Sequence, residues 1–186
     1  QTSLDSTNVS NFQNVDGSAL SSALTITGSS GNNTLIGGSG NDSISGGGGL
    51  DHLFGGDGND IFIIDHTSLA AGSTIDGGNG SNTVNISANS GTIGDTELAA
   101  ALTNTQTIDF TASNVNASLN LSGSQISQMD GGASNTLTLL TNAGDNVTIT
   151  DAAANYTSSV VGNTTNYTIY DDAAHSNVVA HLSLVA

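Results

Sequence analysis

The stretch GGSGNDSISGGGGLDHLFGGDGNDIFI, residues 37–63, places three aspartates at a fixed interval in a glycine-rich frame. Asp42, Asp51 and Asp60 each lie nine residues from the next. The chain has no lysine and no arginine, so it carries no permanent cation that could neutralise these carboxylates. A compact state must therefore hydrate its acids, disperse them or recruit cations from solution.

The nine-residue frame extends on both sides of this stretch. Aligned in nines, the chain reads GSSGNNTLI (28–36), GGSGNDSIS (37–45), GGGGLDHLF (46–54) and GGDGNDIFI (55–63), with a detached copy, GGNGSNTVN, at 77–85. The frame is G-G-x-G-x-D-x-U-x, with an apolar residue at its eighth place in each copy. Glycine permits turn angles that a Cβ would oppose. One apolar residue per nine is typical of a very short strand stacked on copies of itself. The period predicts a parallel β-roll in which turns and strands alternate.

Composition excludes several classes of partner. The chain has 186 residues, of which 16 are Asp or Glu, and its formal net charge is −16. Nucleic acids and anionic membranes need clustered Lys and Arg, so neither is an expected partner. Cysteine is absent, which excludes disulfides and thiolate metal sites. No apolar run approaches the ~20 residues of a membrane span, so no membrane insertion is expected. Because residue 1 is Gln, we interpret the chain as a fragment of a longer protein, and we expect the fragment to be monomeric.

The order of patterns along the chain predicts an all-β protein in three parts. Residues 1–27 are predicted as a linker with a first strand, 28–86 as the β-roll with a loop near 64–76, and 87–186 as a β-rich region, solenoid-like or sandwich-like. Alternating polar and apolar residues predict strands at 83–86, 107–110, 118–121, 136–139 and 147–150. One or two short helices are expected, at 96–102 with Asp95 as the cap and at 124–129.

The spacing of the aspartates favours calcium. Successive turns of a roll fall on opposite edges, so turns 18 residues apart stack, which pairs Asp42 with Asp60 and Asn33 with Asp51. Stacked carboxylates repel one another unless a cation lies between them. Calcium accepts six to eight carboxylate and carbonyl oxygens, whereas magnesium demands tighter geometry and zinc prefers His or Cys. The hard oxygen ligands therefore indicate Ca²⁺.

These residues resemble the RTX nonapeptide repeats of proteins exported by Gram-negative type I secretion systems. The resemblance implies a right-handed parallel β-roll that binds two to three Ca²⁺ ions, each held by two stacked turns. In that family the earlier turn gives carbonyls from its second and fourth places, the later turn from its first and third, and both turns give the sixth-place Asp. For the first ion the implied ligands are Gly38, Gly40, Asp42, Gly55, Asp57 and Asp60. For the second they are Ser29, Gly31, Asn33, Gly46, Gly48 and Asp51. A third ion is expected to join the turn of Gly56, Gly58 and Asp60 to the turn at 76–82, with Asp76 in place of the missing sixth-place Asp.

A second resemblance covers roughly residues 76–186. The order of Thr-Ile-Asp-Phe at 107–110, Met-Asp-Gly-Gly at 129–132 and the apolar end is similar to the C-terminal region of large RTX adhesins. That resemblance implies a type I secretion signal read by the secretion transporter, and a secreted protein at the cell surface of a Gram-negative bacterium. The tail of a type I exported hydrolase and part of an S-layer protein remain alternatives.

No catalytic constellation is apparent, so we expect a non-enzymatic module. Glu97 is the one glutamate, and its predicted place in the first turn of a helix favours capping over acid catalysis. None of the four histidines, His52, His66, His175 and His181, has a ligand partner at helical or loop spacing. The function predicted from sequence is calcium-dependent folding after export.

Overall fold

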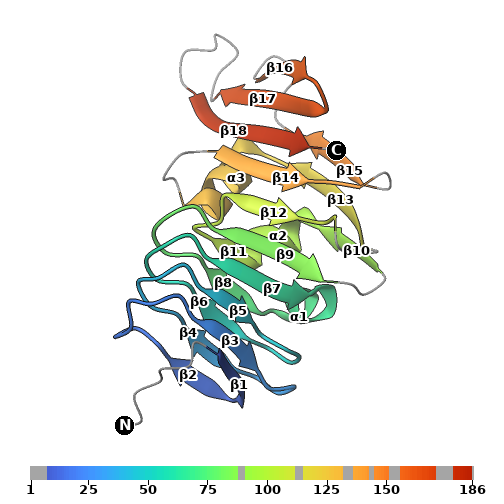
Figure 1. Cartoon of the computed structure of the whole chain (residues 1–186). Coiled ribbons are helices and arrows are strands. Elements are labelled where there is room, and N and C mark those ends of the chain that lie inside the picture. The colour runs from blue at the N-terminus through green and yellow to red at the C-terminus, as the bar shows by residue number, and fades with distance from the viewer. Residues whose placement is uncertain are drawn as a thin grey trace.

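The structure is a computed structural model that describes residues 8–87, 91–111, 115–131, 136–142, 145–150, 156–170 and 178–185. These residues form an elongated stack of strands that runs from the N-terminal end of the molecule to its C-terminal end (Figure 1). From β3 to β9 the chain passes alternately between two parallel sheets, so each pair of strands adds one layer. The predicted all-β fold with a parallel β-roll is confirmed.

The larger sheet runs the whole length of the stack. In the part of the chain that the structure describes it contains ten strands, in the order β1-β3-β5-β7-β9-β12-β14-β18-β17-β16. Its strands are parallel from β1 to β18, and the last two pairs, β18–β17 and β17–β16, are antiparallel. Their bounds are β1 Asn8–Phe12, β3 Thr25–Gly28, β5 Ser43–Ser45, β7 Ile61–Asp65, β9 Thr83–Ser87, β12 Thr107–Asp109, β14 Thr136–Leu140, β16 Tyr156–Val161, β17 Thr164–Tyr170 and β18 Val178–Val185.

Two smaller parallel sheets complete the stack. The second sheet faces the first across the roll and has the order β11-β8-β6-β4-β2. Its bounds are β2 Asn14–Asp16, β4 Thr34–Ile36, β6 His52–Phe54, β8 Thr74–Asp76 and β11 Leu102–Thr103. The third sheet has the order β10-β13-β15, with bounds β10 Gly91–Gly94, β13 Val115–Leu121 and β15 Asn146–Ile149. The segment expected to be a linker thus already contributes β1 and β2.

The core of the roll is built from one apolar side chain per strand, to which β7 and β9 each add a second, Ile64 and Ile86. The first of these residues in each strand is the eighth of its repeat or its equivalent, and its neighbours along the strand are more exposed. Burial of such a side chain stabilises the fold by about 1.5–3 kcal/mol. The buried set comprises Ile26, Leu35, Ile44, Leu53, Phe62, Ile75 and Val84, each at most 1% exposed. The inward apolar position predicted from the repeat is confirmed.

The segment expected to be a loop near 64–76 is instead ordered. Strand β7 continues to Asp65, helix α1 follows at His66–Ala71, and β8 begins at Thr74. The Asp65 carboxylate caps the helix by accepting the Ser68 N–H at 2.9 Å, and Gly72 ends it in the left-handed conformation, with φ of 111°. Leu69 is buried and anchors the helix. This insert lengthens one layer of the stack from 18 to 22 residues.

The region after residue 87 continues the solenoid rather than forming a separate sandwich. Helix α2 spans Asp95–Ala101, and its N-cap is Gly94 rather than the predicted Asp95, because the Gly94 N–H donates to Glu97 Oε2 at 3.0 Å. Helix α3, Gly123–Asp130, includes the predicted segment 124–129. The strands predicted at 83–86, 107–110, 118–121, 136–139 and 147–150 are confirmed as β9, β12, β13, β14 and β15. Within the described ranges, no helix has both the length and the apolar character to cross a membrane.

Candidate metal centre

Three glycine-rich turns share a backbone conformation that favours glycine. At the second and fourth places of each turn, φ lies between 78° and 111°, the left-handed region that side chains with a Cβ rarely adopt. These residues are Gly47 and Gly49, Gly56 and Gly58, and Gly78 and Gly80. The detached copy at 77–85 therefore folds into the same turn as two of the full repeats, although it lacks the sixth-place aspartate.

The sixth-place side chains form a column along one edge of the roll. The N–H of Asp42 donates to Asp60 Oδ1 at 2.8 Å, and the N–H of Leu24 donates to Asp42 Oδ1 at 2.8 Å. The column continues because the N–H of Asp60 donates to Asn82 Oδ1 at 2.9 Å. Asp42 is 2% exposed, and Asp60 and Asn82 are fully buried. The stacking of Asp42 on Asp60, predicted from the 18-residue spacing, is confirmed.

A second column occupies the opposite edge of the roll. The N–H of Asn33 donates to Asp51 Oδ1 at 2.9 Å, and the N–H of Asp51 donates to Ser73 Oγ at 2.9 Å. Asn33, Asp51 and Ser73 are all buried. The predicted pairing of Asn33 with Asp51 is confirmed, and Ser73 takes the next place because α1 occupies the segment where another repeat would begin.

The second side-chain oxygens of these columns differ in their partners. Asp42 Oδ2 accepts the Gly38 N–H at 2.6 Å. Among the described residues, no hydrogen-bond donor reaches Asp51 Oδ2, Asp60 Oδ2 or Asn33 Oδ1, although all three atoms are buried. An unpaired buried carboxylate costs several kcal/mol, and the sequence offers no Lys or Arg to pair with it. These oxygens therefore need a cation from outside the chain.

The electrostatics of the two buried aspartates reflect this lack of countercharge. Burial raises the pKa of Asp60 to about 6, and the negative charges of Asp42 and Asp57 add to that rise, while the Asp42 N–H opposes it. Burial also raises the pKa of Asp51, with the Asn33 N–H opposing the rise and Asp65 adding to it. Without a cation, folding thus raises the pKa of both carboxyls above the ordinary value.

Backbone carbonyls of each turn are directed at the turn stacked on it. Gly38 O lies 2.1 Å from the point that a Cβ on Gly56 would occupy, and Gly40 O lies 2.3 Å from the corresponding point on Gly58. On the opposite edge, Ser29 O has the same relation to Gly47, at 2.3 Å. A side chain at these glycines would fill the space between the turns.

The turns expected to share an ion are therefore stacked on each other. Turn 37–42, with Gly38, Gly40 and Asp42, lies against turn 55–60, with Gly55, Asp57 and Asp60. Turn 28–33, with Ser29, Gly31 and Asn33, lies against turn 46–51, with Gly46, Gly48 and Asp51. The coordination of an ion by these atoms stays a prediction.

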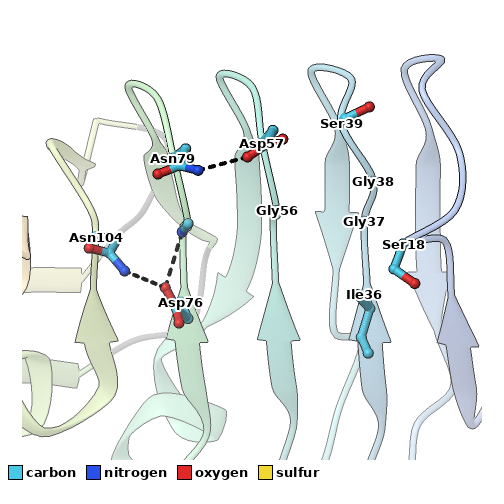
Figure 2. Close-up of a pocket in the computed structure, with 11 residues that line it drawn as sticks. Ser18, Ile36, Gly37, Gly38, Ser39, Gly56, Asp57, Asp76, Asn79 and Asn104 are labelled. Atoms are coloured by element: carbon cyan, nitrogen blue, oxygen red, sulfur yellow. Dashed lines mark hydrogen bonds between the residues drawn. The ribbon is translucent and has the colours of Figure 1, made fainter.

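Two predicted residues, Asp57 and Asp76, direct their carboxylates to the outside of the roll (Figure 2). Asp57 Oδ1 accepts the side-chain amide of Asn79 at 2.7 Å. Asp76 Oδ1 accepts the Asn104 amide at 2.6 Å and the Gly78 N–H at 3.0 Å. The structure places Asn82, rather than Asp76, next to Asp60 in the column.

The sequence assigned only part of the residues that extend the columns. The motif GGNGSN puts Asn82 at the sixth place, where an Asp is expected, and Asp76 was chosen in its stead; the structure places Asn82 in the column, 22 residues from Asp60. Gln106, whose Oε1 accepts the Asn82 N–H at 2.7 Å, follows no glycine-rich turn and had no signal in the repeat.

The donor set fits calcium. Among the described residues, no group of three or more His, Asp or Glu side chains gathers to hold a metal, and His175 lies outside those residues. An ion in the roll must therefore take most of its ligands from backbone carbonyls, together with the unpartnered carboxylate oxygens. Calcium accepts such mixed oxygen shells of flexible geometry.

The raised pKa of Asp60 predicts that the calcium-free roll is more stable at pH 5 than at pH 8. The folded-state pKa of about 6 exceeds the ordinary value of 3.8, so folding binds a proton as the pH falls through 6, and that stabilisation is lost as the pH rises through 6. We expect a melting temperature at least ~2–4 °C higher at pH 5, the shift that about 1 kcal/mol produces in a chain of this size. Thermal melts followed by circular dichroism in calcium-free buffer would measure it, with Asp60→Asn as control. The variant should show a weaker pH dependence, and equal dependence in both proteins would contradict the assignment.

Comparison with known families agrees with this geometry. Residues 27–62 match the family model of the RTX calcium-binding nonapeptide repeat, in four copies. No curated protein and no solved structure matches the chain. The matched segment contains Asp42, Asp51 and Asp60 and ends before Asn82. Residues 27–62 are therefore RTX repeats, a repeat type that binds calcium and is typical of secreted proteins.

Proposed function

We propose that this chain is a module of an exported protein that folds when it binds calcium outside the cell. The observation that carries the proposal is the set of buried oxygens, Asp51 Oδ2, Asp60 Oδ2 and Asn33 Oδ1, that no donor reaches among the described residues. They lie in a chain with no Lys or Arg. Calcium supplies the missing positive charge, and the module needs no catalytic residue for this role.

The proposed ligands come from stacked turns. One ion would be held by Asp42 and Asp60 with carbonyls from turns 37–42 and 55–60. Another would be held by Asn33 and Asp51 with carbonyls from turns 28–33 and 46–51. The second site contains an amide oxygen in place of one carboxylate, so its affinity for a dication is expected to be lower.

Calcium binding acts as a folding switch in this proposal. Each strand of the roll buries only one or two apolar side chains, worth about 1.5–3 kcal/mol each, and a buried carboxylate without a countercharge costs several kcal/mol. The apolar contacts of a layer are therefore offset where its aspartate has no cation. A ligand that binds only the folded state stabilises it by mass action, so calcium shifts the roll to its folded form.

Calcium, but not an equal concentration of magnesium, should increase the β-structure signal in circular dichroism. Asp42→Asn and Asp60→Asn should each raise the calcium concentration at the midpoint by at least ~10-fold, because each removes a carboxylate from the column. Asn33→Asp should lower the midpoint of the weaker site.

Asp57→Asn provides the matched control, since its carboxylate lies in the same turn as Asp60 but contacts Asn79 outside the roll. Its midpoint should remain close to that of the parent. Spectra of the parent that are identical in chelator and in calcium would eliminate the proposed switch.

The location of the switch follows from the scarcity of free calcium in the cytosol. An acidic chain with few aromatic residues stays unfolded where its cation is scarce, and an unfolded chain can pass through a narrow secretion channel.

We propose that the parent protein is a large RTX adhesin of a Gram-negative cell surface, and that residues 87–186 carry a type I secretion signal for the transporter. The resemblance of this region to adhesin C-termini supports the assignment. The repeats would also suit the tail of a type I exported hydrolase or an S-layer protein.

The end of the chain suits recognition before folding. In the folded state β18 lies between β14 and β17, and Ala180 and Leu182 are fully buried. A transporter could therefore contact this uncharged apolar segment in the unfolded chain more readily than in the folded one.

Fusion of residues 87–186 to an unfolded passenger should direct type I export. Removal of the last ~60 residues should abolish export, because it deletes most of the segment proposed to carry the signal, including β18. An immunoblot of the culture medium would measure the amount of passenger that is exported. A Leu182→Ser variant should be exported at the parental rate if the transporter reads general polarity, and more slowly if it reads β18. Export of the truncated fusion at the parental rate would show that the signal lies elsewhere.

A further inference from the structure

Strand β16 forms the C-terminal edge of the larger sheet (Figure 1). Among the described residues it pairs with β17 alone, in six consecutive antiparallel pairs without a shift of register. Edge strands of native proteins are usually protected from further pairing by a lysine, a proline or a β-bulge. The chain has no lysine and no proline, and the β16–β17 pairing contains no bulge. Strand β16 therefore lacks the usual protection of a sheet edge.

The inner face of the larger sheet extends beyond the layers that cover it. Helix α3 packs on β14 and β18, and the third sheet ends at β15. One column of inward side chains crosses the sheet from its core to this edge: Val84, Ile108, Leu139, Leu184, Thr165 and Val160. The first three are fully buried, whereas Val160 is 70% exposed. The column of the core thus continues to an apolar side chain that remains exposed at the edge.

The hairpin of β16 and β17 is uncharged, although the chain as a whole is acidic. Residues 152–170 contain none of the 16 Asp and Glu residues and no histidine. A second copy of the chain carries the same formal charge of −16, so acidic surfaces of the two copies repel each other. At the β16 edge two copies can approach without such repulsion. Charge therefore favours a second copy of this chain as the partner of this edge.

The sequence of β16 fits pairing with itself. An antiparallel strand can pair with its own copy about a two-fold axis, and residues directly opposite each other then project from the same face. An axis at Ser158 places Tyr156 opposite the partner's Val160, and the symmetry repeats this pair on the other side of the axis. Aromatic and β-branched side chains form a favourable cross-strand pair. An axis at Ser159 would place Val160 opposite the partner's Ser158 and would form no such pair.

The Tyr156 side chain is already ordered for this contact. Its ring packs edge to face on the ring of Tyr167, with 5.8 Å between the ring centroids. Tyr156 is half-buried, while the rest of β16 is exposed. A side chain held in this way loses less conformational entropy when a partner binds.

We infer that two copies of the chain form a dimer through antiparallel pairing of β16 with β16, about a two-fold axis at Ser158. The pairing joins the larger sheets of the two copies into one and brings each Val160 against the partner's Tyr156. This dimer replaces the monomer expected from the sequence. It is independent of the proposed calcium switch, because β16 lies outside the RTX repeats of residues 27–62.

Sedimentation velocity of the full chain in calcium, over a range of chain concentrations, tests the association. We expect a monomer–dimer equilibrium for the parent chain. Ser158→Asp should raise the dissociation constant of the dimer at least ~10-fold, because it places two like charges directly opposite each other at the axis. Asn163→Asp is the matched control, since it adds the same charge to the exposed turn of the same hairpin and should leave the dissociation constant unchanged. Ser158 is exposed as well, and circular dichroism establishes that both variants are folded.

A cysteine at the axis tests the register without adding a charge. The chain has no cysteine, so Ser158→Cys introduces a single thiol. The two Cα atoms would lie about 4.5–5.5 Å apart, within the range that a disulfide spans, so mild oxidation should convert this variant into a covalent dimer. The two copies of Ser159→Cys would be diagonal neighbours about 7–8 Å apart, so this variant should form several-fold less covalent dimer.

A parent chain that sediments as a monomer at every concentration would overturn the inference, and so would a dimer that Ser158→Asp leaves unchanged. Assemblies that grow beyond a dimer would also overturn it, because they would indicate head-to-tail pairing of β1 with β16. More covalent dimer from Ser159→Cys than from Ser158→Cys would contradict the axis at Ser158.

Discussion

The structure depends on buried carboxylate oxygens that no hydrogen-bond donor reaches among the described residues. In the roll these are the second carboxylate oxygens of Asp51 and Asp60, in a chain whose formal charges at neutral pH are all negative. A buried carboxylate without a partner costs several kcal/mol, about as much as one or two buried core side chains contribute. The apolar core by itself therefore gives little margin to layers 28–63, which is why we propose that a bound cation decides whether they fold.

The chemistry of the same column changes after Asp60. Asp42 and Asp60 present carboxylates to the neighbouring turn, whereas Asn82 presents an amide that donates to Asn104 O. One layer further, the Gln106 amide donates to Asp130 O at 3.2 Å. The backbone stacks in the same parallel manner through all these layers. Under the proposed function, one segment of the solenoid is stabilised by cations and the next by amide hydrogen bonds.

Much of the roll could be predicted because its rules are local and periodic. The nine-residue interval places Asp42 on Asp60 and Leu35 next to Leu53, and the structure contains both relations. Helix α1 was not predicted, because six residues are too short to show helical periodicity, although Asp65 and Gly72 are its capping residues. The lengthened layer then led to Asp76 instead of Asn82 as the next member of the column. In the C-terminal half, alternation located β12, β13, β14 and β15, but alternation holds no information about partners. The position of β18 between β14 and β17 could therefore not be predicted.

Amide hydrogen exchange, read peptide by peptide with and without calcium, tests the central claim most directly. The account predicts that calcium strongly protects amides in residues 34–63, including those of Asp42 and Asp60. It also predicts that amides in β12 and β14 are protected to a similar degree in calcium and in chelator. Equal protection of residues 34–63 in both conditions would contradict the claim that cations stabilise the repeat layers.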